Sequence, residues 1–333
     1  MKKIKLGIFG KRGMVGRTLI KRLKKRYYKD NFDIYYLENT HISNKIHIII
    51  SCKGNYFSKL IIKKIKKKKW NGYFIDTSSF LRKTKTIILD PLNKEQIIKE
   101  LKIKEKFFTG GNCTVSLMLI SILGIIKLKI SKIYCTTFQS VSGGGFKLFN
   151  SLLKQNIKIL NNIKKNKFFL KSLNIKKITK GFNETLCYSL IPWIDKDIKN
   201  GSSKEEEKNY FETNKILNIN KKIRVFSTCV RVNSLRCHSL SLVIKFKKEL
   251  SLKKFNKLIS NNKYIKIVKN NKEETLKYLN PIYCSEKKKI FVGRIKKLCK
   301  KEFSIFIVGD QLLWGAIEPV VRMLKIIKKN VFN

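Results

Sequence analysis

Residues 4–16 read IKLGIFGKRGMVG, an apolar run that leads directly into a glycine-rich turn. Residues 4–9 predict a buried strand, and the apolar spacing after Met14 predicts a helix at 14–27. The glycines permit a tight turn, and the start of the helix offers free N–H groups to a pyrophosphate. The stretch therefore predicts a dinucleotide-binding unit that includes Gly10 and Gly13. An ordinary glycine-rich turn is the alternative.

Strands and helices continue to alternate through the first third of the chain. Short apolar runs predict further strands at 34–37, 46–50, 74–75 and 87–89. A helix is expected at 57–69, and this alternation indicates a parallel sheet with right-handed crossovers. Glu38 ends the second strand, where an acid accepts the ribose 2′-hydroxyl of NAD in this type of fold. A solvated loop charge explains Glu38 equally well.

The second half of the chain has longer strands and fewer alternations. Strands are predicted at 133–140, 223–232, 239–246, 290–295 and 303–308. Helices are predicted at 146–162, at 204–217 and, closing the chain, at 312–328. This pattern indicates a mixed, largely antiparallel sheet covered by helices. The fold class is therefore α/β, with a Rossmann-like dinucleotide-binding domain followed by an α+β domain.

The net charge of +53, from 75 basic and 22 acidic residues, first suggests nucleic acid. Only ten of the basic residues are arginine, so the planar group that reads phosphates and bases is scarce. The lysines are spread among many Ile, Asn and Phe residues, which all have AT-rich codons. We interpret the charge as the bias of an AT-rich genome on solvated surfaces, and we expect no specific nucleic-acid binding.

The cysteines, the histidines and the apolar runs argue against metal-binding, membrane-spanning and secreted proteins. None of the eight cysteines forms a CxxC pair, and Cys237 and His238 would point to opposite faces of a strand, so we expect no metal site. The longest apolar stretch, 115–126, is too short to cross a bilayer. The basic N-terminus has too short an apolar run for a signal peptide. We expect a reduced, soluble, cytoplasmic protein.

Cys113 is the candidate nucleophile. Residues 110–115 read GGNCTV, so two glycines allow an unusual backbone before Cys113 begins an apolar helix. The free N–H groups and dipole of a helix N-terminus stabilise a thiolate, which attacks carbonyls and holds acyl groups. The alternative is one more buried structural cysteine.

Two further stretches supply partners for this cysteine. QSVSGGG (139–145) is a glycine-rich turn between a strand and a helix, where a ligand approaches the backbone closely. RVNSLRCH (231–238) ends in His238, the one histidine with a credible acid–base role. It begins with Arg231, whose forked donors fit a carboxylate. A flexible turn and a structural histidine remain the alternatives.

Several ordered stretches together resemble aspartate-β-semialdehyde dehydrogenase, in the form found in Gram-negative bacteria. They are KRGMVG (11–16), GGNCTVSLML (110–119), QSVSGGG (139–145), SLIPWIDK (189–196), ETNKIL (212–217), CVRVNSLRCHS (229–239) and VGDQLLWGAIEP (308–319). The resemblance covers nearly the whole chain. It implies an NADP-binding domain at 1–112, a catalytic and dimerisation domain at 113–310, and a last helix, 311–330, that packs back onto the first domain. It also implies a homodimer.

The resemblance implies a reaction and a role for each matching residue. L-Aspartyl-4-phosphate and NADPH would give L-aspartate-4-semialdehyde, inorganic phosphate and NADP, in lysine, threonine and methionine biosynthesis. Cys113 would be the nucleophile, His238 the acid and base, and Gln139 the group that orients the intermediate. Substrate would be held by Arg231 and Glu212 at its carboxylate and amino groups, and by Arg82, Asn112 and Lys215 at its phosphate. Cofactor contacts would come from Gly10, Arg12, Gly13, Met14, Val15, Thr40, Ser142, Gly143 and Gln311.

The cofactor segment departs from the family pattern. The stretch between Leu37 and Ile46 is shorter than usual and begins with Glu38, and Lys53 stands where the family commonly has Gln. Glu38 would repel a 2′-phosphate, whereas Lys45 and Lys53 would attract one. We therefore expect NADP as the cofactor, with NAD left open by Glu38.

Two alternative functions were weighed. One is a related enzyme, an N-acetylglutamyl-phosphate or glyceraldehyde-phosphate dehydrogenase, which the ETNKIL and RCHS stretches argue against. The other is a degenerate basic homologue with an RNA-associated role. Drift without selection should have altered some of the dispersed residues Cys113, Gln139, Glu212, Lys215, Arg231 and His238, which are all intact.

Overall fold

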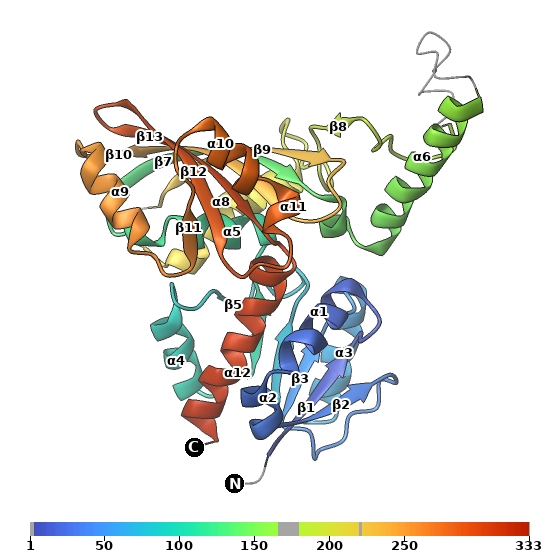
Figure 1. Ribbon diagram of the computed structural model, residues 1–333. Helices are drawn as coiled ribbons and strands as arrows, with labels where there is room; N and C mark the ends of the chain where they lie inside the picture. The colour runs from blue at the N-terminus through green and yellow to red at the C-terminus, as the bar shows by residue number, and fades with distance from the viewer. Residues whose placement is uncertain (1–2, 166–179, 220–221, 333) are drawn as a thin grey trace.

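The computed structural model describes residues 3–165, 180–219 and 222–332. Figure 1 shows two bodies, one above the other, each built around one sheet. The first contains a six-stranded sheet in the order β2-β1-β3-β4-β6-β5, and the second a seven-stranded sheet in the order β11-β12-β13-β10-β7-β9-β8. The two ends of the chain lie close together beside the first sheet.

The first sheet is parallel throughout, as predicted. Its strands are β1 (Ile4–Phe9), β2 (Phe32–Leu37), β3 (Ile48–Ser51), β4 (Tyr73–Asp76), β5 (Thr86–Ile88) and β6 (Phe107–Gly110). Its helices are α1 (Met14–Leu23), α2 (Arg26–Asn31), α3 (Asn55–Lys67) and α4 (Lys94–Lys102). Sequence reasoning did not find β6 or α4, which are short and bury few apolar residues.

The single helix predicted at 14–27 is wrong, because the chain breaks between Leu23 and Arg26. Lys25 is extended, with a ψ of 143°, and starts a new helix. The break redirects the chain so that Leu23 and Tyr28, 1% and 2% exposed, both reach the core. Apolar spacing alone does not report such a change of direction.

The second sheet is mixed and largely antiparallel, which confirms the predicted class. Its strands are β7 (Ile130–Gln139), β8 (Leu190–Ile191), β9 (Arg224–Val232), β10 (His238–Phe246), β11 (Ile265–Ile267), β12 (Ile290–Cys299) and β13 (Glu302–Gly309). β7 with β9 and β11 with β12 are the parallel pairs. The accompanying helices are α5 (Cys113–Ser121), α6 (Phe146–Lys165), α8 (Lys204–Leu217), α9 (Leu252–Ser260), α10 (Lys272–Tyr278) and α11 (Pro281–Cys284).

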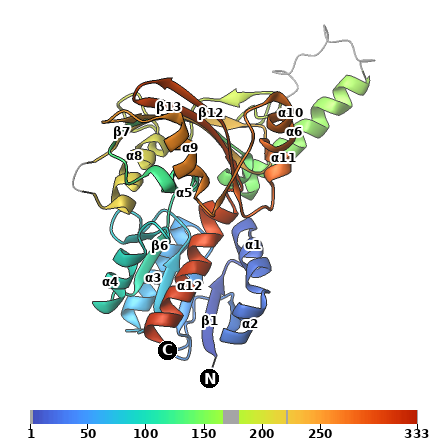
Figure 2. The same ribbon diagram turned by 60° about the vertical axis from the view of Figure 1, so that its left-hand side comes forward.

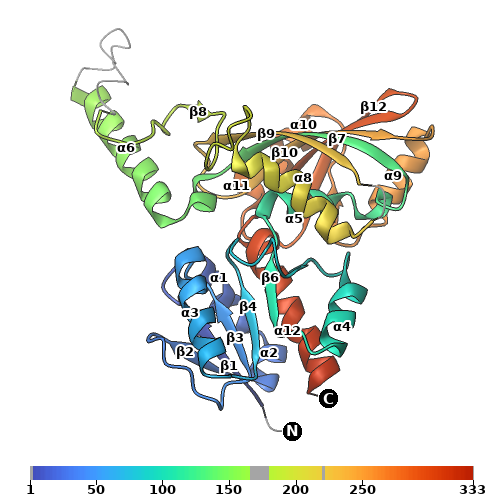
Figure 3. The same cartoon turned by 180° about the vertical axis from the view of Figure 1, so that it is seen from behind.

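Helices α5 and α8 cover the face of the second sheet that looks toward the first domain, as Figure 3 shows from behind. Along β7 the burial alternates: Ile133 and Cys135 lie in the core between sheet and helices, whereas Tyr134 is 42% exposed on the opposite face. Helix α5 is buried along nearly its whole length. Its first residue, Cys113, therefore sits between the two domains.

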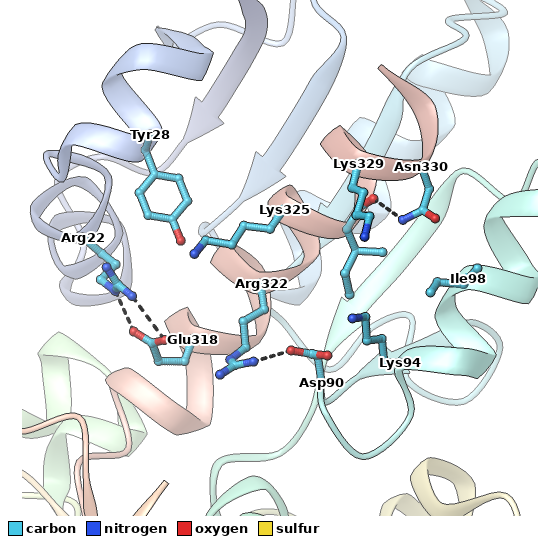
Figure 4. Close-up of a pocket in the computed structure, with 11 residues that line it drawn as sticks. Arg22, Tyr28, Asp90, Lys94, Ile98, Glu318, Arg322, Lys325, Lys329 and Asn330 are labelled. Atoms are coloured by element: carbon cyan, nitrogen blue, oxygen red, sulfur yellow. Dashed lines mark hydrogen bonds and ion pairs between the residues drawn. The ribbon is translucent and has the colours of Figure 1, made fainter. Parts of the chain in front are cut away.

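The chain closes with the π-helical turn η4 (Leu313–Ile317) and helix α12 (Glu318–Val331), where one helix at 312–328 was predicted. Figure 2 shows α12 running alongside the first sheet. Val320 and Leu324 join the first domain's core. Two ion pairs, drawn in Figure 4, tie α12 to this domain: Arg22 Nε lies 2.6 Å from Glu318 Oε1, and Arg322 pairs with Asp90.

Among the described residues, no helix combines the length and the apolar character needed to cross a bilayer.

Candidate active site

A cleft of about 620 Å³ lies where the two domains meet. It is lined from the first domain by the start of α1 and the loop after β4, and from the second by the ends of β7 and β9. The residues that line it include nine singled out from the sequence: Val15, Arg82, Asn112, Cys113, Gln139, Ser142, Gly143, Arg231 and Gln311. The fold thus brings residues from many separate stretches to one place.

Cys113 occupies the first position of α5, and Asn112 caps this helix. The Asn112 side chain accepts hydrogen bonds from the N–H groups of Thr114, at 2.8 Å, and Val115, at 3.3 Å. A Cβ on Gly315 would lie 2.4 Å from the Cβ of Cys113, so only glycine lets η4 pack this closely. The cap and the glycine contact fix the direction of the cysteine side chain.

Cys113 Sγ lies 3.3 Å from Nε2 of His238, the first residue of β10. Burial, followed by the charge of Glu205, raises the pKa of the thiol to about 12, although Arg82 and Arg231 act the other way. Burial, followed by the charge of Arg231, lowers the pKa of His238 to about 3. The pair is therefore a neutral thiol and a neutral imidazole.

Burial of Cys113 therefore opposes the thiolate form that the helix N-terminus is expected to stabilise. Loss of hydration penalises the charged sulfur more than the nearby cations Arg82, Arg231 and Lys208 favour it.

His238 is completely buried and held on both sides. Its Nδ1 lies 3.1 Å from the backbone N of Ser140 and 3.2 Å from the Ser140 hydroxyl. A Cβ on Gly143 would come within 3.0 Å of Cε1 of the imidazole. The glycine-rich turn predicted to admit a ligand therefore also makes room for the imidazole ring of His238.

Gln139 and Asn112 share a carboxylate that sequence reasoning missed. Glu205 Oε1 lies 2.9 Å from Asn112 Nδ2 and 3.3 Å from Gln139 Nε2, and its Oε2 lies 2.9 Å from Lys208 Nζ. Burial opposes ionisation of Glu205, but the charge of Lys208 and the donated hydrogen bonds outweigh it and lower the pKa. Lys208 also pairs with Asp195, at 2.6 Å.

A signal for Glu205 and Lys208 existed in the sequence. Together with Glu212, they are spaced three and four residues apart in α8, which places them on one face of the helix.

The two arginines reach the cleft from opposite domains. Arg231 Nη1 donates to the carbonyl of Ser140 at 2.7 Å, and burial lowers the pKa of its guanidinium. Arg82 Nη1 lies 3.1 Å from Glu212 Oε1, a pair with side chains only 12% and 2% exposed. Arg82 Nε donates to the carbonyl of Gly110 at 2.9 Å.

Glu212 and Lys215 lie behind the wall of the cleft. Glu212 Oε2 accepts from the N–H of Asn112 at 2.6 Å and lines an adjacent cavity of about 230 Å³. Lys215 Nζ donates to the carbonyls of Arg82, at 2.7 Å, and Lys83, at 2.8 Å. Arg82 borders both cavities and connects these two residues to the cleft.

The turn between β1 and α1 has the geometry of a phosphate cradle. Gly10 has a φ of +88°, and a Cβ on Gly16 would lie 2.0 Å from the carbonyl oxygen of Gly10. Gly13 caps α1 without any side-chain hydrogen bond, and Met14 and Val15 form its first turn. The backbone N–H groups there face no capping side chain, so the turn fits the pyrophosphate of a dinucleotide.

The end of β2 carries the residues expected at the adenosine ribose. Glu38 Oε1 lies 2.9 Å from Lys11 Nζ and 3.8 Å from Arg12 Nη2, and hydrogen bonding to Lys11 lowers its pKa. Thr40 contacts Lys64 through its hydroxyl. These groups fit either a ribose hydroxyl, through Glu38, or a 2′-phosphate, through the cations around it.

A family model described as "Semialdehyde dehydrogenase, dimerisation domain" matches residues 122–314. Together with the dinucleotide-binding fold, this match places the chain in the semialdehyde dehydrogenase class of proteins.

Comparison with solved structures identifies the family more narrowly. The aspartate-semialdehyde dehydrogenase from Francisella tularensis is 36% identical, with a TM-score of 0.88, over 98% of this chain and 100% of that one. Aspartate-semialdehyde dehydrogenase II from Vibrio cholerae, complexed with ASA, is 21% identical, with a TM-score of 0.84 over 99% and 100%. The Candida albicans enzyme with NADP is 14% identical, with a TM-score of 0.69 over 99% of each chain. The chain belongs to the aspartate-semialdehyde dehydrogenase family.

Proposed function

We propose that the protein reduces L-aspartyl-4-phosphate with NADPH to L-aspartate-4-semialdehyde and inorganic phosphate. The observation that carries this proposal is the 3.3 Å contact between Cys113 Sγ and His238 Nε2, in a cleft that also holds Gln139 and two arginines. A nucleophile, a proton-exchanging partner and cations for anionic groups are what acyl transfer from a phosphate requires. The reaction serves lysine formation through diaminopimelate, and threonine and methionine formation.

In the first half of the reaction, Cys113 Sγ attacks the carbonyl carbon of the acyl phosphate. A C–S bond forms, the C–O bond to phosphate breaks, and the thiol proton leaves with the phosphate. Arg82 and Asn112 lie on the cleft to hold the phosphate. Lys215 contributes from behind Arg82. Its ammonium group has three donors, of which two are bonded to backbone carbonyls, so the third is left for the phosphate.

In the second half, the bound cofactor supplies a hydride for the thioester carbonyl. His238 interacts with the oxygen as negative charge develops, and Gln139 orients the acyl group. The tetrahedral adduct then collapses to the aldehyde and expels Cys113 as a thiolate, which takes up a proton from solvent to restore the thiol. Arg231 holds the substrate's carboxylate, and Glu212 holds its amino group. Because Glu212 accepts a hydrogen bond from the N–H of Asn112, it has to reach the amino group past the Asn112 backbone.

For the cofactor we propose NADP, held along Gly10, Arg12, Gly13, Met14, Val15, Thr40, Ser142, Gly143 and Gln311. The cations Lys11 and Arg12 support this choice, because they flank Glu38 at the end of β2, where we expect the adenosine ribose. Glu38 weakens the preference relative to a chain without an acid there, so NADH is expected to be a slow second substrate.

We also propose a homodimer that forms through the exposed face of the second sheet. Tyr134 on β7 and Phe226 on β9 stack on this face, with ring centroids 5.3 Å apart, and remain 42% and 48% exposed. Leu190 and Trp193 add further exposed apolar surface at the same end of the sheet order. Clustered exposed aromatic residues are typical of protein–protein interfaces.

The test follows NADPH formation with semialdehyde, phosphate and NADP, and repeats the assay with NAD. We expect phosphate-dependent reduction of NADP, and none with the Cys113→Ser variant. Absence of phosphate-dependent reduction of either cofactor by the wild-type protein would exclude the proposed function.

A further inference from the structure

We propose that a second cavity at the junction of the two domains binds a small oxyanion of the phosphate type. The cavity has a volume of about 300 Å³. Six charged side chains line it: Lys21, Arg22 and Lys25 from the first domain, and Arg236, Glu286 and Lys288 from the second. Among the described residues, none lines both this cavity and the cleft that holds Cys113. The site is therefore separate from the active site and does not depend on the proposed function.

Glu286, the one carboxylate among the six, is already paired with two of the cations. It lies 3.0 Å from Lys21 Nζ in the first domain and 3.1 Å from Arg236 Nη1 in the second. Arg236 Nε also lies 2.9 Å from Asp310, which accepts from the N–H of Glu286 at 2.7 Å. These contacts hold the loop of Glu286 against α1, and they leave no negative charge over for the remaining cations.

Lys25 and Lys288 are the cations that stay uncompensated. Arg22 is paired with Glu318, whereas Lys25 and Lys288 form no ion pair with a carboxylate of the described residues. Their side chains contact each other instead. Burial, followed by this contact with Lys25 and the charge of Arg22, lowers the pKa of Lys288 to about 8, although Glu318 acts the other way. Two like charges from different domains thus meet in one cavity.

The backbone anchors both lysines. Lys25 stands at the break between α1 and α2, and its carbonyl accepts from the N–H of Tyr28 at 2.9 Å. The carbonyl of Lys288 accepts from Trp314 Nε1 at 2.6 Å. Because each side chain starts from a fixed point, movement of the backbone does not relieve the repulsion between the two ammonium groups.

A phosphate group fits this arrangement better than a carboxylate. The planar guanidinium groups of Arg22 and Arg236, which suit carboxylates, are already bound to carboxylates. The groups left are two point charges with three donors each, which suit the several oxygens and the double charge of a phosphate. An anion between the two ammonium groups replaces one repulsion by two attractions. The volume is at the lower end for ligand sites, about 300 Å³, and has room for a small phosphate ester.

Two consequences follow from binding. The anion joins the two domains, because Lys25 belongs to the first and Lys288 to the second. It also raises the pKa of Lys288 back toward its ordinary value of 10.5, because an opposite charge favours the ammonium form. The second effect is confined to this cavity, so phosphate bound in the active-site cleft does not obscure it.

The test measures how fast acetic anhydride acetylates Lys288, relative to the exposed Lys63 in the same sample, by mass spectrometry. Only the neutral amine reacts, so at low salt the rate should reach half its maximum near pH 8. Inorganic phosphate should slow the reaction at that pH about fivefold, which corresponds to a pKa rise of about one unit. Sodium chloride at the same ionic strength controls for screening. Phosphate that protects Lys288 no better than chloride would overturn the proposal.

Lys25→Met removes the half of the site that the first domain supplies. In this variant the pKa of Lys288 should rise without any anion, and phosphate should slow acetylation no more than chloride does. Lys24→Met is the matched control, because it removes the neighbouring exposed lysine, which does not line the cavity. It should keep the full protection by phosphate. An equal loss of protection in both variants would assign the effect to the net charge of the chain and overturn the site.

Glycerol 3-phosphate separates the two sources of a phosphate group. Protection of Lys288 by this ester at lower concentrations than inorganic phosphate would identify a site for a phosphorylated metabolite. Protection by inorganic phosphate alone would identify the free ion as the ligand. Both results support the proposal, and the absence of protection by either compound contradicts it.

Discussion

Cys113 Sγ and His238 Nε2 are 3.3 Å apart in a site that keeps both groups neutral. Burial is the main cause in each case, since it raises the pKa of the thiol to about 12 and lowers that of the imidazole to about 3. The contact therefore differs from a preformed thiolate–imidazolium ion pair. The reactivity of Cys113 should therefore be low in the protein without substrate, and the rate of its alkylation in solution should show this.

Alkylation of Cys113 by iodoacetamide should be slow near neutral pH, because the thiolate is the reactive form and is scarce. Its rate should still be rising at pH 9, the ordinary pKa of a cysteine. Mass spectrometry at a series of pH values measures this rate against the exposed Cys299. A Cys113 rate that has levelled off below pH 9 would contradict the neutral pair.

Stability should fall in acid because of His238. Its folded-state pKa is about 3 and its ordinary pKa 6.5, so between these values the unfolded chain binds a proton that the folded chain excludes. The free energy of unfolding should lose up to about 1.4 kcal/mol per pH unit as the pH falls below 6.5. Urea unfolding of wild type and His238→Gln should show this loss in the wild type only. His41→Gln, at an exposed histidine, should behave as the wild type.

Glu38→Gln should raise the preference for NADPH over NADH severalfold. The substitution removes the acid that favours a ribose hydroxyl and releases Lys11, now 2.9 Å from Glu38, for a phosphate. The ratio of kcat/KM for the two cofactors measures the effect. Glu249→Gln provides the control, since Glu249 is also an exposed partner of a lysine, Lys300, but lies in the other domain. An unchanged ratio in Glu38→Gln would place Glu38 outside the ribose site.

Glu318→Ala should destabilise the protein by about 3 kcal/mol, because it leaves Arg22 buried without its partner. The two side chains are 13% and 7% exposed and join α1 to α12. The free energy of urea unfolding measures the loss. Asp30→Ala breaks a pair with Arg26 whose side chains are 96% and 61% exposed, and it should cost at most about 0.5 kcal/mol. Equal losses in the two variants would show that burial of the pair does not matter.

Phe226→Lys should convert the proposed dimer to a monomer. It places a charge in the exposed stack with Tyr134, where a partner surface would have to bury it. Light scattering after size-exclusion chromatography measures the mass. Ile103→Lys changes an equally apolar residue, 76% exposed, at the far side of the first domain, and should leave the mass unchanged. A Phe226→Lys protein that remains a dimer would move the interface elsewhere.

Local signals located most of the elements. Helix α8 was predicted with its bounds, 204–217, and the structure shows that Ser203 and Glu206 form a capping box at its start. The turn at Gly10 was recognised because glycine at a positive φ leaves a sequence trace. Short elements with few apolar residues, such as α4, left no comparable trace.

The sequence by itself determined the strand and helix segments, the glycine-rich turns and the residue types available for catalysis, because each of these depends on neighbours a few positions away. Only the tertiary structure decided how they work together. Cys113 and His238 are 125 positions apart, and Glu205 and Lys208 line the cleft because the fold packs α8 against α5. The charge states were decided at the same level, because desolvation depends on which distant segments pack around a group. That is why the pKa of Cys113 depends on the segments packed around it and not only on its position at the start of a helix.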